Sequence, residues 1–189
     1  MHRVFPKLAS RHSLLILAFC GVCFWPIVKG QSPGNVPKVL TIDRPLVLPL
    51  AISPDVQTAL SLLPSDSLSA LPTLDLEIRC EPTTQRDAPN VRVFLNHPSA
   101  SQKTPLEDPH YVSSFAIYPS PSVPDSSEGM LDFIMNATRT LNRLAQTGDL
   151  HVGGSLTATL VATPPRPGAK ITATLSIREV VLKQRSAQR

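Results

Sequence analysis

The sequence has 189 residues, a formal net charge of +4, and 20 prolines against 8 glycines. That length suits one domain with a hydrophobic core and is short for two. Arg3, Lys7, Arg11 and Lys29 carry four of the positive charges, and the chain after residue 30 holds 14 basic and 14 acidic residues. A neutral domain lacks the large basic surface that drives nucleic-acid binding, so we expect no nucleic-acid partner.

The first 30 residues have the three parts of a secretory signal peptide. Residues 1–13 are basic without an acidic residue, an apolar run follows from Leu14 to Val28, and Gly30 precedes a polar stretch. The run of about 15 residues is short for a membrane helix, which needs roughly 20. The sequence therefore predicts cleavage after Gly30 and a secreted (periplasmic or extracellular) domain at 31–189. The alternative is an uncleaved N-terminal membrane anchor.

Cys80 is the only cysteine after the predicted leader, which contains Cys20 and Cys23. No intramolecular disulfide can then form in the mature chain. Cys80 follows Leu74, Leu76 and Ile78 on the apolar face of an alternating stretch, where a free thiol behaves as a small hydrophobic group. We expect a buried structural cysteine, and the alternative is a reactive thiol or an intermolecular disulfide.

Alternation with period two and frequent prolines predict an all-β fold, an antiparallel β-sandwich of about seven strands with one short helix. Residues 53–72 read as a long connection, on which 56–63 can form a short helical turn, and residues 183–189 as a flexible tail. The predicted strands lie at 39–50 (interrupted by Pro45), 73–81, 91–96, 111–118, 131–135, 155–163 and 170–182.

A helix over 137–146 is predicted by the helical spacing of Leu141, Leu144 and Ala145. Asn136 is a favourable N-cap, and Gly148 can end the helix in a left-handed conformation. Asn136 also opens the glycosylation sequon Asn-Ala-Thr. Capping and glycosylation would compete, because both use the same side-chain amide.

The sequence contains no recognisable catalytic cluster, since no Ser-His-Asp or Cys-His arrangement stands out. We expect no catalytic residue, no cofactor and no enzymatic activity. His97 and His110 bracket one loop, and with Asp108 they are candidates for an exchangeable metal site. The alternative is that these side chains are simply solvated.

Five segments in order resemble the C-terminal domain of tyrosinases and polyphenol oxidases. The resemblance covers about residues 36–182, and the order and spacing of the segments carry it. The matching segments are Leu40–Leu48 (LTIDRPLVL), Val91–Asn96 (VRVFLN), His110–Tyr118 (HYVSSFAIY), Leu131–Leu144 (LDFIMNATRTLNRL), and the pair Leu156–Val161 and Ile171–Leu182.

The resemblance implies that this chain is a β-sandwich. In that family the sandwich packs on a helical dicopper domain and can shield the mouth of its active site. The copper ligands belong to the helical domain, so no catalytic residue carries over to this chain. The departure that we expect is that the sandwich here stands alone behind its own signal peptide. We therefore expect a non-catalytic accessory or interaction module for a separate tyrosinase-like dicopper oxidase. The alternatives are an independent structural or ligand-binding sandwich and a copper or other metal carrier.

Overall fold

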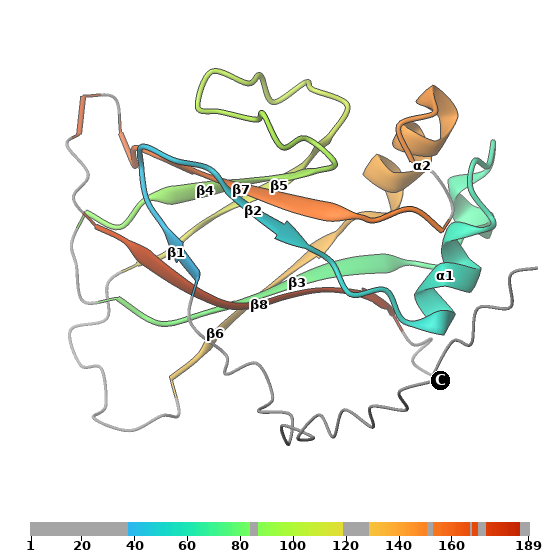
Figure 1. Ribbon diagram of the computed structural model, residues 1–189, viewed down its shortest axis with the longest axis horizontal. Helices are drawn as coiled ribbons and strands as arrows, with labels where there is room; N and C mark the ends of the chain where they lie inside the picture. The colour runs from blue at the N-terminus through green and yellow to red at the C-terminus, as the bar shows by residue number, and fades with distance from the viewer. Residues whose placement is uncertain are drawn as a thin grey trace, which may run out of the picture. The chain divides into compact units, whose positions relative to one another are not determined.

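Two antiparallel four-stranded sheets pack face to face in the computed structural model (Figure 1). The structure describes residues 38–83, 87–118, 129–150, 153–166, 168–169 and 173–185, so the predicted signal peptide lies outside the described residues. The predicted all-β sandwich is confirmed. The first sheet has the order β1 (Lys38–Leu40), β8 (Leu175–Gln184), β3 (Leu74–Cys80), β6 (Leu131–Asn136); the second has β2 (Leu46–Pro49), β7 (Thr157–Thr163), β4 (Asn90–Leu95), β5 (Tyr111–Ala116).

The core lies between the sheets and follows the alternation of the sequence. In β3 the side chains of Leu74, Leu76, Ile78 and Cys80 are buried, as the pattern predicts. Successive strand residues point to opposite faces, so the intervening side chains of β3 point to the outer face of the first sheet. Ion pairs cross that outer face, including Arg79–Asp132, Lys183–Glu77 and Arg185–Asp75.

The predicted strand 39–50 is in fact two strands that belong to different sheets. β1 pairs with β8, whereas β2 pairs with β7. A turn closed by the Thr41–Arg44 bridge carries the chain across, and Pro45 has no backbone N–H with which to continue a ladder. The described residues therefore form eight strands, where about seven were expected.

The connection between β2 and β3 holds a helix, α1 (Pro54–Leu60), and a 3-10 turn, η1 (Leu68–Ala70). Ser53 caps α1 because its Oγ accepts a hydrogen bond from the Val56 N–H, and Pro54 fits the first helical position. The described residues thus form two helices, one more than the fold class predicted. α1 overlaps the helical turn predicted at 56–63, and α2 (Thr138–Thr147) corresponds to the helix predicted over 137–146. No helix within the described ranges is long and apolar enough to cross a membrane.

The start of α2 differs from the prediction by one residue. Asn136 ends β6, opposite Asp75 of β3, and Ala137 is the N-cap. Sheet pairing of Asn136 displaces the helix start, but the Asn136 Oδ1 still accepts a hydrogen bond of 3.0 Å from the Thr138 N–H. Gly148 ends the helix with a φ of 82°, as predicted.

Residues 183–185 are part of ordered structure, although the sequence analysis predicted a flexible tail from residue 183. β8 continues to Gln184, inside the segment that was expected to be a flexible tail. Arg185 then donates two hydrogen bonds, of 2.7 and 2.9 Å, to the carboxylate of Asp75. Residues 183–185 are therefore tied to β3, and 186–189 lie outside the described residues.

Candidate functional site

The connection between β4 and β5, residues 96–110, folds over the outer face of the second sheet (Figure 1). Phe94, Val161 and Ala100 form a small apolar cluster there, with Tyr111 packed against it. Arg92 fixes the connection because its Nη1 donates to the carbonyls of Gln102 and Thr104, both at 3.2 Å. β7 is consequently buried on both faces, which its sequence pattern alone did not indicate.

His97, Asp108 and His110, the three candidates for a metal site, come together at the two ends of this connection. The His97 Nε2 lies 3.6 Å from the Asp108 Oδ2, and the two imidazole ring centroids are 5.1 Å apart. The His110 Nδ1 lies 2.8 Å from the Leu95 carbonyl oxygen, which can only accept, so Nδ1 carries the hydrogen. The Asp108 Oδ1 accepts a hydrogen bond from the His110 N–H.

These contacts tie the three side chains to one another and to the backbone. Among the described residues, no group of three or more His, Cys, Asp or Glu side chains is arranged to hold a metal ion. Asp108 links the two ends of the connection, because its Oδ1 accepts a hydrogen bond from the His110 N–H and its Oδ2 contacts His97. The three residues that the sequence analysis singled out do lie together, and their contacts hold the two ends of the connection. We call this arrangement the clasp.

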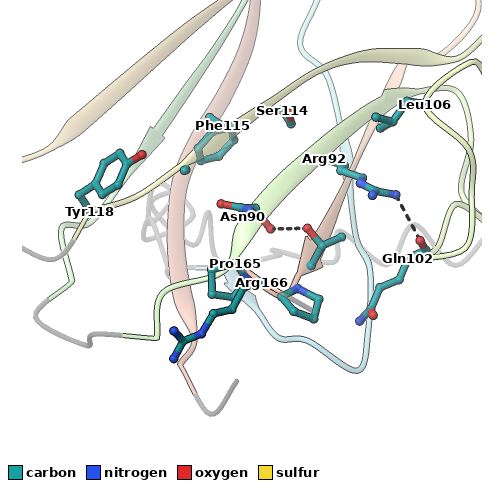
Figure 2. Close-up of a pocket in the computed structure, with 12 residues that line it drawn as sticks. Asn90, Arg92, Gln102, Leu106, Ser114, Phe115, Tyr118, Pro165 and Arg166 are labelled. Atoms are coloured by element: carbon teal, nitrogen blue, oxygen red, sulfur yellow. Dashed lines mark hydrogen bonds between the residues drawn. The ribbon is translucent and has the colours of Figure 1, made fainter. Parts of the chain in front are cut away.

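A groove of about 700 Å³ lies beside this connection on the second sheet (Figure 2). We call it the β5 groove. Strands β4, β5 and β7 form its floor, and residues 102, 106 and 164–166 form its walls. Its lining residues are Asn90, Arg92, Gln102, Leu106, Ser114, Phe115, Ala116, Tyr118, Thr163, Pro164, Pro165 and Arg166.

The β5 groove combines exposed apolar side chains with positive charge. Tyr118 is 84% exposed and Leu106 is 47% exposed, and they lie on opposite sides of the groove in Figure 2. Arg92 and Arg166 supply two guanidinium groups, and none of the lining residues that the structure describes is acidic. No sequence pattern predicts this site, because its residues are brought together only by the β5–β4–β7 register.

β5 is an edge strand, because β4 is its only partner among the described strands. Helix α2 covers the beginning of this edge: the Thr140 Oγ1 donates to the Tyr111 carbonyl at 2.9 Å, and the Arg143 Nε donates to the Pro109 carbonyl at 2.8 Å. Beyond that point, no strand of the described part of the chain pairs with the outer side of β5. The open part of the edge leads into the β5 groove.

Cys80 is fully buried in the core, as predicted. Burial raises the pKa of its thiol to about 12, and the carboxylates of Asp132 and Glu81 contribute in the same direction. A thiol with that pKa stays protonated at neutral pH, and the thiolate is the form that attacks or binds metals. Cys80 is therefore a packing residue rather than a nucleophile.

The Asn136 side chain is exposed on the edge strand β6. The other polar residue of its sequon, Thr138, is buried, and its Oγ1 accepts a hydrogen bond from the Leu74 N–H at 2.8 Å. Both sequon side chains thus support the strand-to-helix junction. Glycosylation of Asn136 stays a prediction.

No family model matches the sequence, and no curated protein matches it either. Solved structures do match. A recombinantly expressed latent aurone synthase (polyphenol oxidase) gives a TM-score of 0.46 at 14% identity, over 77% of this chain and 25% of that one. The same enzyme from its natural source gives a TM-score of 0.45 at 15% identity, over 76% and 25%.

The described fold is thus similar to part of these polyphenol oxidases. The chain spans about a quarter of the length of the polyphenol oxidases that it matches. At this level of identity the comparison concerns the fold, and the oxidase activity of those proteins is not transferred by it.

Proposed function

We propose that this chain is a non-catalytic interaction module that docks on another protein through the β5 groove. The observation that carries the proposal is that the exposed side chains of Tyr118 and Leu106 line the β5 groove together with two arginines. Tyrosine and arginine are enriched among the residues that dominate binding at protein interfaces. The outer face of the first sheet differs, since its charges are paired with one another.

The partner that we propose is a separate tyrosinase-type dicopper oxidase, which the module shields or assists. The order of the five sequence segments supports this choice, because in the tyrosinase and polyphenol oxidase family the matching domain packs on a dicopper domain. A non-catalytic role is supported by the protonated, buried Cys80 and by the mutual contacts of His97, Asp108 and His110.

We also propose that the module is secreted after removal of residues 1–30. The basic start and short apolar run of the leader support export. N-terminal sequencing of the protein from the medium or periplasm of its source tests this. A new N-terminus at Gln31 is expected. Retention of Met1 in a membrane fraction would instead establish the N-terminal anchor.

Binding is tested with a dicopper oxidase from the same organism that lacks a sandwich domain of its own. The oxidase is immobilised, and the full chain is titrated over it by surface plasmon resonance. We expect saturable binding that Tyr118→Ala weakens about tenfold or more, as for a central interface tyrosine. Ile134→Ala is the matched control, since Ile134 is 61% exposed on β6 and does not line the groove. The proposal fails if the oxidase does not bind, or if both variants bind like the native chain.

A further inference from the structure

We propose that the β5 groove receives an extended acidic segment of the partner, which adds as a strand to the open edge of β5 and places a carboxylate at Arg166. This inference rests on the proposed function and names the chemistry of the docked segment. Three features of the described residues support it: the strand edge, the unbalanced charge, and the apolar side chains at the groove's sides.

The strand edge provides the backbone part of the recognition. An edge strand presents N–H and C=O groups on which an extended peptide can form a further ladder. Thr140 already satisfies the Tyr111 carbonyl, so α2 covers only the start of β5. The ladder would therefore form on the stretch from Ser113 to Ala116, at the side of the groove.

The charge of the groove selects an acidic side chain. Arg92 uses its Nη1 to hold the 96–110 connection, and its guanidinium has further N–H donors. Arg166 is exposed on the turn after β7. Arginine binds a carboxylate through two parallel N–H···O bonds, and no carboxylate of the described residues lines the groove. On the first sheet, by contrast, Arg79 and Lys183 each contact a carboxylate of a neighbouring strand.

Tyr118 and Leu106 add an apolar requirement. In an extended segment, residues two apart point to the same side. A segment whose carboxylate faces Arg166 therefore presents the side chains two residues before and after it to the same groove. Since Tyr118 and Leu106 are exposed apolar surface there, an apolar residue at one of those positions would bury them. The expected signature is an acidic residue with an apolar residue two positions away.

The test is selection of random decapeptides, displayed on phage, against the immobilised full chain. We expect the recovered peptides to share an aspartate or glutamate with an apolar residue two positions away. A fluorescent synthetic copy of the most frequent peptide is then titrated with the chain by fluorescence anisotropy. Replacing its acidic residue by the corresponding amide should weaken binding about tenfold, the scale of a buried charged contact. Failure to recover peptides, or recovery without acidic enrichment, overturns the inference.

Two protein variants and one modified peptide locate the site. Arg166→Gln should weaken binding of the acidic peptide as much as the amide replacement does. It should also abolish the difference in affinity between the acidic peptide and its amide variant. Arg44→Gln removes an exposed arginine that does not line the groove and should leave binding unchanged. N-methylation of the peptide at alternate backbone nitrogens should abolish binding if it pairs with β5. Equal binding by Arg166→Gln, or by the methylated peptide, overturns the inference.

Failure of this inference and failure of the proposed function give different results. If the oxidase binds but acidic peptides do not, the module docks through another chemistry and only the inference fails. If acidic peptides bind at Arg166 but the oxidase does not, the groove is as described and the proposed partner is wrong.

Discussion

Phe115 of β5 and Phe133 of β6 stack across the two sheets, with ring centroids 4.1 Å apart and ring planes at 25°. Both strands are sheet edges, so the stack closes one side of the sandwich. Offset aromatic pairs stabilise by roughly 0.5–1.5 kcal/mol beyond the area that they bury. Because Phe115 also lines the β5 groove, this contact holds the groove's floor on the core.

Phe133→Ala should lower the free energy of unfolding by about 2 kcal/mol. Truncation of a fully buried phenylalanine to alanine lowers the free energy of unfolding by about 3–5 kcal/mol, and the cost is smaller here because Phe133 is only partly buried. Urea denaturation followed by fluorescence or circular dichroism measures the change. Ile134→Ala, one residue along but exposed, should cost less than about 0.5 kcal/mol. Equal losses for the two variants would mean that the stack does not hold the sheets together.

Asp108→Ala should loosen the connection over the second sheet. The variant loses the hydrogen bond to the His110 N–H and the contact with His97, for a cost of about 1 kcal/mol. Hydrogen exchange should accelerate at residues 97–110 and stay unchanged in β3. Glu107→Ala removes the neighbouring exposed carboxylate and is the control. Unchanged exchange in Asp108→Ala would show that the clasp is not needed.

Copper(II) or zinc(II) should not bind stoichiometrically at His97, Asp108 and His110. These side chains are engaged with each other and with the backbone. Elemental analysis after incubation and dialysis should find far less than one metal per chain. The thermal midpoint should also stay constant, because only a ligand that binds the folded state raises it. A stoichiometric metal that His97→Ala removes would establish a metal carrier.

Cys80 should resist alkylation in the folded protein. Burial raises its pKa to about 12, so iodoacetamide at pH 8 meets a protonated, inaccessible thiol. Peptide mapping by mass spectrometry should find Cys80 modified only after unfolding in urea. The folded-state pKa lies above that of an unfolded thiol. The resulting stabilisation is therefore complete below the unfolded pKa of about 8.5 and is lost as the pH rises from there toward 12. Rapid labelling of the folded chain at pH 8 would contradict the buried assignment.

Acid should weaken the fold partly through Asp132. Hydrogen bonding to Arg79 lowers the pKa of this carboxyl, so its contribution is present above the unfolded pKa of about 3.9. The contribution disappears as the pH falls through the lower, folded value. Asp132→Asn should therefore reduce the dependence of the free energy of unfolding on pH below about pH 4. The reduction should be slight, because the Arg79 and Asp132 side chains are both exposed. Asp66→Asn, at an exposed carboxylate between α1 and η1, is the control, and identical profiles for the two variants would exclude this role of the Arg79 pair.

Local patterns predict most of the core but not the site. Alternation in 73–81 places Leu76 and Cys80 inward because the period of a strand is fixed by its backbone. It does not reveal that 39–50 divides between two sheets, since both halves have the same pattern. The β5 groove cannot be predicted from local patterns, because Arg92, Tyr118 and Arg166 come to line one groove only through strand pairing over more than 70 residues.

The central claim is that the chain docks on a dicopper oxidase through the β5 groove. The most direct measurement is the rate of catechol oxidation by a separately expressed oxidase of the same organism, titrated with the native chain and with Arg166→Gln. We expect a saturable change in rate with the native chain, and about tenfold more of the variant for the same effect. A rate that does not respond to the native chain at any concentration, or that responds equally to both proteins, would contradict the claim.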